Sequence, residues 1–458
     1  MFTGKLLFAG FGSIGQAVAP ALLNHWKLPP SRVRALAADQ DGAAVALALG
    51  IEFDVQPIHE GNLGEVLASR LNVGDLLVNV SVQVSSKALI EWCQAHGVLY
   101  LDTCVEPWEG GYLPDDGRTL AGTTNYALRE DVLALRGAGR PTAVIAHGAN
   151  PGLISHLAKA GLLDMANEQG LSLPEGPHAW ARLCQSLGVK VIHIAERDTQ
   201  QAEGAHGGAF VNTWSAEGLL AEAWQCAELG WGTHEKSLPH DAIQHTYGNQ
   251  AGIFLDTHSV AVSVQSWVPN GGPQKAYLIT HHEALSLAEF LTVPGDVRFG
   301  SELPAYRPTV YYAYAPCEAT RLGLDAWADS GFGSPSEKRV LRDELVTGHD
   351  QLGVLFVFDG GAFWYGSTVQ LEHARTVAPF NNATSLQVVA GILGALDWML
   401  KHPLAGVVEA EDLPHEEVLE VAKPYMGLVH GSWTDWQPEH RGRLIAPGDL
   451  LQFSTFRH

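Results

Sequence analysis

Cysteine is scarce in this sequence, and its spacing forms no motif. The 458 residues include only 5 cysteines, and no two of them are spaced as Cys-x-x-Cys. A small, odd-numbered and scattered set argues against a disulfide framework and a cysteine-rich zinc site, and it is typical of reduced thiols. We therefore expect a cytoplasmic protein without disulfide bonds. The cysteines are Cys93, Cys104, Cys184, Cys226 and Cys317.

Basic residues and long apolar runs are scarce as well. Lysine and arginine number 28 against 50 aspartates and glutamates, which gives a formal net charge of −22. Such a chain repels nucleic acid and anionic membrane surfaces, and it attracts cations. We find no run of the roughly 20 apolar residues that a transmembrane helix needs, and the apolar start is too short for a signal peptide. We expect no nucleic-acid partner and no membrane attachment.

The chain has enough apolar material for packed cores. Hydrophobic residues make up 46% of it, and its length corresponds to two or three domains of about 100–200 residues. The first third alternates short apolar runs with helical patterns, which predicts a parallel sheet covered on both faces. The predicted strands are Lys5–Ala9, Val33–Ala38, Asp75–Val80, Val98–Asp102 and Ala143–Ala146. The predicted helices are Ile14–Trp26 and Lys87–His96. Pro20 should cause a kink in the first of them.

The middle of the chain has a different pattern, because strand-like runs cluster there with turn signals between them. This pattern predicts a mostly antiparallel sheet with helices, hence an α+β arrangement. Helical spacing returns over Asn382–Lys401. The predicted strands are Val189–Ala195, Val260–Trp267, Ala276–Thr280, Val310–Tyr314 and Val354–Phe358, the last in a hairpin with Ala362–Tyr365.

A glycine loop stands between the first predicted strand and the first predicted helix. Gly10-Phe11-Gly12-Ser13-Ile14-Gly15 has the form G-x-G-x-x-G, and its place after a strand and before a helix is the context that a dinucleotide-binding loop requires. Gly10 would permit the tight turn, Gly12 would admit a pyrophosphate, and Gly15 would let helix pack on strand. The amides of Ser13 and Ile14 would begin the helix that holds the phosphates.

Further cofactor contacts are expected where the other strands of this sheet end. Asp39 lies 24 residues after Gly15, near the about 20 expected for an acid that binds the ribose hydroxyls and disfavours a 2′-phosphate. It favours NAD over NADP, although Asp41 is an alternative acid and Arg34 argues weakly for NADP. The other candidates at strand ends are Ser81, Val82, Asp102 and Thr103.

We accordingly predict an α/β fold with three parts. Residues 1–150 form an N-terminal Rossmann dinucleotide-binding domain, and residues 151–378 form an inserted α+β domain for catalysis and dimerisation. Residues 379–458 form a returning helix and a C-terminal segment that packs on the Rossmann domain.

Seven segments together carry a resemblance to a known family. The chain resembles the saccharopine dehydrogenase-like superfamily and, within it, the bacterial homospermidine synthases, over nearly its whole length. The glycine loop is generic, but the set is specific. The segments are GFGSIG at 10–15, DTCVEPW at 102–108, HGANPG at 147–152, AERDTQ at 195–200, NTWSAEG at 212–218, THHEA at 280–284 and APFNNATSLQV at 378–388.

The resemblance implies a polyamine-forming reaction with NAD as a bound prosthetic group. Putrescine, or spermidine as donor, would be oxidised to an imine, ammonia would leave, and condensation with a second putrescine and re-reduction would give homospermidine. The resemblance also implies a homodimer. A diamine carries two ammonium groups at neutral pH, since amine pKa values lie near about 10. Its site therefore needs carboxylates, aromatic faces and a base, and the middle domain contains all three residue types.

The resemblance also implies individual roles. Trp214 would hold the amine by cation–π attraction, and Glu222 would receive it. If both residues were in one helix, their eight-residue spacing would leave the two side chains about 80° apart around the helix axis. Alone, Trp214 reads as a core aromatic and Glu222 as a solvated acid. His281 would transfer protons, and His281-His282-Glu283 is a poor metal site because adjacent side chains diverge. The other implied residues are Asn150 and Glu196 in catalysis; Glu106, Glu283 and Asp350 in substrate binding; and Gly148, Asn150, Pro151, Asn382 and Thr384 at the cofactor.

Two rival functions remain open at this point. A saccharopine or carboxyspermidine dehydrogenase would need arginines for carboxylate substrates, and none of the six middle-domain arginines that we considered stands beside the Trp214, Glu222 or His281 segments. A nucleotide-sensing protein would keep the fold without the chemistry. The arginines are Arg182, Arg197, Arg298, Arg307, Arg321 and Arg339.

Overall fold

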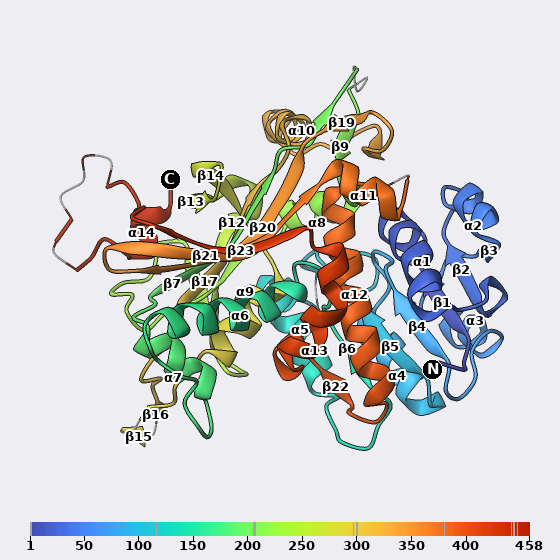
Figure 1. Ribbon diagram of the computed structural model, residues 1–458, viewed down its shortest axis with the longest axis horizontal. Coiled ribbons are helices and arrows are strands. Elements are labelled where there is room, and N and C mark those ends of the chain that lie inside the picture. The colour runs from blue at the N-terminus through green and yellow to red at the C-terminus, as the bar shows by residue number, and fades with distance from the viewer. Residues whose placement is uncertain are drawn as a thin grey trace.

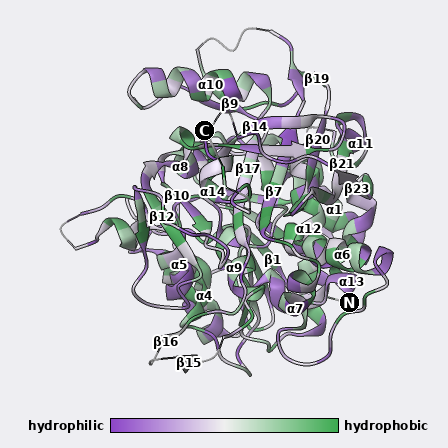
Figure 2. Ribbon diagram, turned by 90° about the vertical axis from the view of Figure 1, so that its left-hand side faces the viewer, coloured by the Kyte–Doolittle hydropathy of each residue, from purple (hydrophilic) through white to green (hydrophobic). Residues whose placement is uncertain are grey.

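The protein is built around two large β-sheets, which lie side by side (Figure 1). The computed structural model describes residues 2–458 except 116, 205–207, 296, 299, 300, 380, 441, 443, 444 and 447. In Figure 2, hydrophobic residues concentrate in the central strands, whereas the outer helix α10 alternates hydrophobic and hydrophilic residues. This distribution places the cores on the faces of the two sheets.

The first sheet has seven strands, all parallel, in the order β22-β6-β5-β4-β1-β2-β3. Its apolar strands confirm the predicted Rossmann-type fold, because all four residues of β1, β4 and β5 are buried. The sequence did not predict β3, which is polar and half exposed, or the two-residue β22. The strands are β1 Leu6–Ala9, β2 Val33–Ala37, β3 Glu52–Val55, β4 Leu76–Asn79, β5 Leu99–Asp102, β6 Ala143–Val144 and β22 Val407–Val408.

Helices cover both faces of this sheet. The hydroxyls of Ser85 and Thr124 accept bonds from backbone amides and so cap α4 and α5. Helix α1 continues through Pro20 over its full length. The helices of this half are α1 Ser13–Trp26, α2 Ala43–Leu49, α3 Leu63–Ala68, α4 Ser86–His96 and α5 Asn125–Leu133.

The second sheet has ten strands and is antiparallel except for the pair β7 and β17. It follows the order β11-β12-β10-β17-β7-β20-β21-β23, and β14 pairs with both β13 and β17. The predicted strand Val260–Trp267 is wrong in its first part, where a 3-10 turn, Ser259–Ala261, precedes β13. The strands are β7 Val191–Asp198, β10 Cys226–Gly230, β11 Ala242–Gln244, β12 Gly252–His258, β13 Ser263–Val268, β14 Gly272–Ile279, β17 Thr309–Ala315, β20 His349–Phe358, β21 Gly361–Gln370 and β23 Leu428–Thr434.

Three small two-stranded sheets and nine further helices complete the described elements. The small sheets are β8 Gln201–Ala202 with β19 Leu345–Thr347, β9 Phe210–Asn212 with β18 Lys338–Val340, and β15 Val297–Arg298 with β16 Ser301–Glu302. The helices are α6 Leu153–Glu168, α7 Ala179–Ser186, α8 Ala216–Trp224, α9 His282–Phe290, α10 Glu318–Asp329, α11 Leu371–Val377, α12 Ala383–Lys401, α13 His415–Ala422 and α14 Phe453–Phe456.

Helix α12 joins the two halves. By length and composition it could cross a membrane, which we did not expect from the sequence, but 83% of its most apolar window is buried inside the protein. It contributes Leu386 and Val389 to the core of the parallel sheet and Ala390 to the core of the second sheet. The chain beyond α12 then adds β22 to the first sheet and β23 to the second. Residues 379–458 therefore contact both halves, whereas we expected packing on the first.

A buried glycine of α12 gives a test of this packing. A Cβ at Gly391 would lie 1.8 Å from the carbonyl oxygen of Gly148, whereas a Cβ at Gly64 in α3 would meet nothing within 4 Å. We expect Gly391→Ala to lower the free energy of unfolding by about 3 kcal/mol and Gly64→Ala to raise it by about 0.5 kcal/mol. Urea denaturation of both variants measures the difference, and equal stabilities would contradict the close approach.

Candidate active site

A cavity of about 950 Å³ opens at the carboxyl ends of the parallel strands. Its wall contains the residues that directly follow β1, β2, β4 and β5, which is where open α/β sheets bind nucleotides. Of the predicted cofactor ligands, the lining includes Gly10, Gly12, Ser13, Ile14, Asp39, Ser81, Val82 and Thr103.

The three glycines of the loop have three different surroundings. Gly10 has a φ of +87°, and a Cβ there would lie 2.6 Å from the carbonyl oxygen of Val80. A Cβ at Gly12 would meet nothing within 4 Å, so this backbone is open to a ligand. A Cβ at Gly15 would lie 3.0 Å from the Phe11 ring. The geometry fits a pyrophosphate cradle with a tight turn, an open approach and close helix packing.

Charged residues stand around the Asp39 side of the cavity. Asp39 accepts a bond from the Asp41 amide at 2.9 Å, and Asp41 lies 3.4 Å from a guanidinium nitrogen of Arg342. Arg34, which argued for NADP, instead pairs with Glu52. No local pattern predicted the cations that reach this cavity from the distant 338–342 segment. They are Lys338, Arg339 and Arg342.

Several predicted cofactor ligands do not line this cavity. The Asp102 carboxylate is buried and accepts bonds from the Ala146 amide at 2.6 Å and the Tyr100 hydroxyl at 2.8 Å. The bond from Ala146 ties the end of β5 to the segment that follows β6. Asn382 caps α12 through the Ser385 amide. The others outside the lining are Gly15, Gly148, Asn150, Pro151 and Thr384.

Trp214 and Glu222 line the same cavity. Trp214 precedes helix α8, whose first residues are capped by the Ser215 hydroxyl, and its ring lies against Gly218, where a Cβ would be 3.0 Å away. The expected 80° separation does not apply, because only Glu222 is inside the helix. The indole and the carboxylate therefore share one wall of the site.

His281 connects the two halves at this point. Its Nδ1 lies 3.0 Å from Asn150 Oδ1, and its Nε2 lies 3.1 Å from Glu222 Oε2. Glu283 lies 3.5 Å from Nδ1, and neither of its oxygens has a hydrogen-bond partner among the described residues. Burial opposes protonation of His281, but Glu222 and Glu283 outweigh it and raise its pKa to about 10. With acceptors at both nitrogens, His281 is an imidazolium at neutral pH.

Three carboxylates form a buried cluster beside His281. Glu196 and Asp198 project from one face of β7, and Asp350 on β20 pairs in register with Asp198. Tyr312 lies on β17, the strand next to β7, and its hydroxyl donates to Glu196 Oε2 at 2.7 Å. The centre of the Tyr312 ring lies 4.4 Å from that of the His281 ring. The cluster therefore joins the His281 site directly.

The cluster contains more acid than the protein neutralises. Burial raises the pKa of Glu196 to about 7 and that of Asp198 to about 6. Burial, with the charges of Glu196 and Asp198, raises the pKa of Asp350 well above its usual range. Neither oxygen of Asp350 has a hydrogen-bond partner of good geometry among the described residues. Arg197, the next residue in the chain, does not neutralise Glu196, because its guanidinium donates to the Gly271 carbonyl.

Two further features extend the site. Glu106 lines the nucleotide cavity, and burial raises the pKa of its carboxyl to about 7 although the Gln83 amide donates to it. A second cavity of about 1270 Å³ reaches Asp198 and Gln200 from the side of Phe210 and α10. Asp198 of the acid cluster thus lines the second cavity, and Glu222, which contacts His281, lines the first.

Sequence reasoning missed Asp198, Thr213 and Tyr312. Thr213 donates to Asp198 at 2.8 Å directly before Trp214 in the chain. The alternation of Glu196 with Asp198 was a signal, since residues two apart on a strand share a face. The pairing of β7 with β17 and β20, which brings Tyr312 and Asp350 to that face, had no local signal.

The fold and site define a dinucleotide-binding enzyme class with an acidic, aromatic pocket in a second domain. Residues 6–145 match the model of the saccharopine dehydrogenase NADP binding domain, and residues 148–432 match that of the saccharopine dehydrogenase C-terminal domain. The chain is 42% identical to homospermidine synthase from Blastochloris viridis over 98% of this chain and 94% of that protein. It is 40% identical to homospermidine synthase from Mesorhizobium japonicum, with the same coverage.

A solved structure agrees with these relatives. The crystal structure of homospermidine synthase from Legionella pneumophila in complex with NAD superposes with a TM-score of 0.91 at 42% identity, covering 100% of this chain and 98% of that one. The chain therefore belongs to the homospermidine synthases within the saccharopine dehydrogenase family.

The ion pair at His281 gives a test of the site's electrostatics. The imidazolium, with a pKa of about 10 against an ordinary 6.5, stabilises the fold fully below about pH 6.5, and this contribution is lost as pH rises through 10. We expect Glu222→Gln to lower the pKa of His281, because burial then opposes protonation with only Glu283 remaining. Histidine-selective NMR titration measures the midpoint.

The matched control is Glu217→Gln, which removes an acid of the same helix that pairs with Lys338. This variant should titrate as the native protein does. An unchanged His281 midpoint in Glu222→Gln would refute the ion pair.

Proposed function

We propose that this protein is a homospermidine synthase that uses bound NAD. The observation that carries the proposal is the buried, uncompensated group of carboxylates beside His281, whose ring contacts Glu222 in the wall of the nucleotide cavity. A dication with a flexible apolar chain fits such a pocket, since its ammonium groups supply the missing positive charge.

The reaction balances without any external oxidant. One amine carbon of putrescine, or of spermidine as donor, loses a hydride and gives an imine. The amine of a second putrescine adds to this imine, and ammonia leaves when putrescine is the donor, or 1,3-diaminopropane when spermidine is the donor. Reduction of the new carbon–nitrogen double bond gives homospermidine. When bound, NAD supplies the acceptor and the returning donor of that hydride, so it is regenerated in each turnover.

The residues of the site divide the work by charge. Trp214 presents a ring face that would hold an ammonium at the wall of the cavity, an interaction of about 0.5–2 kcal/mol. Glu222 accepts the amine, and Asp350, Asp198 and Glu196 hold the distal ammonium. Glu106, on the cofactor side, and Glu283, beside His281, add negative charge at either end.

Proton transfer is assigned to His281 and the acid beside it. An amine must be neutral before it loses hydride or attacks the imine, so a base has to take its proton. Glu222 lies in the cavity and contacts His281 Nε2 at 3.1 Å. The pair of Glu222 and His281 takes this proton from the amine, holds it, and returns it to the departing ammonia. Asn150 Oδ1 fixes the ring from its other nitrogen.

A dehydrogenase acting on an amino acid is the rival function. Its substrate carboxylates would need cationic partners in the pocket. Among the described residues, no lysine or arginine makes an ion pair or hydrogen bond with Glu196, Asp350, Glu222 or Glu283. The cations that do line the nucleotide cavity are already paired: Lys338 with Glu217, Arg339 with Glu344 and Arg342 with Asp41. This arrangement favours an amine substrate.

The remaining assignments rest on family and composition. Asp39 in the cavity wall supports NAD over NADP, since a carboxylate there repels a 2′-phosphate. The five cysteines are all free thiols, which supports a cytoplasmic location. We also propose a homodimer, on the strength of the family resemblance.

The proposal is tested by product analysis. Purified protein with NAD and putrescine should yield homospermidine and ammonia in equal amounts, while NADH remains below the enzyme concentration. Chromatography of the polyamines and absorbance of NADH are measured in the same reaction. Accumulation of NADH in step with product would support the dehydrogenase, and no reaction of any amine would support a binding protein.

Substitutions at Trp214 test the ammonium contact. Trp214→Phe keeps a weaker ring face, and Trp214→Leu keeps only bulk, so putrescine binding should weaken in that order. We expect an increase in KM of roughly 2- to 30-fold for the leucine variant. Steady-state kinetics with diamines of several lengths measure it. Identical constants for all three proteins would exclude the cation–π contact.

A further inference from the structure

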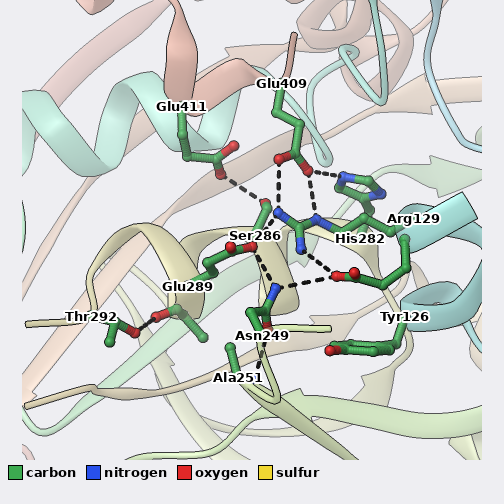
Figure 3. Close-up of polar contacts among 12 residues, drawn as sticks. Tyr126, Arg129, Asn249, Ala251, His282, Ser286, Glu289, Thr292, Glu409 and Glu411 are labelled. Atoms are coloured by element: carbon green, nitrogen blue, oxygen red, sulfur yellow. Dashed lines mark hydrogen bonds and ion pairs between the residues drawn. The ribbon is translucent and has the colours of Figure 1, made fainter. Parts of the chain in front are cut away.

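Helix α9 begins at the reaction site. His281 is its N-cap residue, His282 is its first residue and Glu283 its second, and no side chain caps its free amides. His281 and Glu283 contact each other at the site. The His282 ring instead points to Glu409, which belongs to the parallel-sheet half (Figure 3). The position of the His281 ring therefore depends on what holds the first turn of α9.

Three contacts hold α9 along one face. His282 Nε2 lies 2.8 Å from Glu409 Oε1, Ser286 donates to Glu411 at 2.8 Å, and Glu289 lies 2.6 Å from an Arg129 nitrogen. Positions i, i+4 and i+7 lie on one stripe of a helix. Figure 3 shows the three side chains meeting this polar layer.

The partners in these three contacts belong to the other half of the molecule, although Glu289 also accepts a bond from Asn249 of its own half. Glu409 and Glu411 directly follow β22, the edge strand of the parallel sheet, and Arg129 lies on α5. Arg129 grips Glu409 with two bonds, Nε to Oε1 at 2.6 Å and Nη2 to Oε2 at 2.7 Å. The sheet that carries the nucleotide cavity is thus linked to the helix that carries His281.

Burial makes this link stiff. Arg129 is 2% exposed, Glu409 4% and His282 5%. A buried bidentate pair of this kind has a fixed geometry and is costly to break. Burial opposes ionisation of Glu409, but Arg129 and His282 outweigh it and hold the pKa of this carboxyl well below its usual range. Glu409 is therefore a constant anionic anchor for His282.

We propose that His282 is a positioning residue that, through Glu409 and Arg129, sets the place of His281 relative to the nucleotide cavity. The role rests on the proposed function only for its effect on turnover. Its effect on the contacts of His281 with Glu222, Glu283 and Asn150 is a property of the resting protein.

The test compares three substitutions of His282. Gln keeps an N–H donor at the place of Nε2, Asn carries a donor too short to reach Glu409, and Leu carries none. For Asn and Leu we expect kcat to fall about 10- to 100-fold, as for a displaced catalytic group. KM for putrescine should stay within about threefold, because Trp214 and Asp350 lie on other elements. Gln should restore most of the loss.

A second readout does not depend on turnover. NMR titration of His281 should show a lower pKa in the Asn and Leu variants, since its contacts with Glu222 and Glu283 loosen, and a native value in Gln. Groups that face His281 from all sides stay unchanged in these variants: Glu222, Glu283, Glu196, Asn150 and Tyr312.

The matched control is Ser286→Ala, which removes the contact one turn further along α9. It should lower the melting temperature and leave both kcat and the His281 titration native. If Ser286→Ala reproduces the His282→Leu changes, or if Asn and Leu behave as the native protein, the positioning role is refuted. If the native protein makes no homospermidine, the proposed function fails, while the titration still decides the role of His282.

Discussion

Buried carboxylates without a protein cation dominate this structure. Asp350 is fully buried, Glu196 and Asp198 are 4% exposed, and Glu283 has no hydrogen-bond partner for either oxygen among the described residues. An isolated buried charge is costly, so part of this group stays protonated in the resting protein. In the proposed function, an ammonium ion would replace those protons directly and balance the charge of the cluster.

The same constraint explains why the site lies at the junction of the two halves. Asn150 follows the last strand before the connection into the second half, and His281 follows β14 of the other sheet. They meet only because α12 packs so closely that a Cβ at Gly391 would overlap the Gly148 carbonyl. Neither half alone holds both the nucleotide loop and the acid cluster. Binding of the nucleotide and of the amine is thus built into one packed interface.

The sequence predicted what local patterns determine. The glycine loop, the strands after it and the apolar helix over 382–401 follow from hydrophobic periodicity and from glycine and other turn residues within short segments of the chain. Trp214 and Glu222 were found through the resemblance, but their relative direction was not, because Trp214 stands before the helix rather than in it.

The features that the sequence did not predict depend on which strands pair and on which face of the strand or helix a side chain lies. Asp102 appeared to end a strand at the cofactor, yet as the last residue of β5 its side chain turns inward, and the next residue, Thr103, lines the cavity. The side chains of Asn382 and Thr384, at the start of α12, contact Thr213 and Gln200, whereas the preceding Asn381 donates to the Ser13 carbonyl of the glycine loop. Such choices between two faces are settled by long-range packing, which a single sequence does not display.

The enclosure of the site follows from the chemistry it supports. An imine in water hydrolyses to an aldehyde, so an enzyme that passes an imine from one amine to another must exclude water while keeping the second amine at hand. His281 is 6% exposed, and its ring packs on Tyr312, which in turn holds Glu196. Aromatic walls remove water, and the acids keep an ammonium in place without it. Carboxyls with pKa values near 7, such as Glu196 and Glu106, can take up and release protons during a cycle that begins and ends with the same charge.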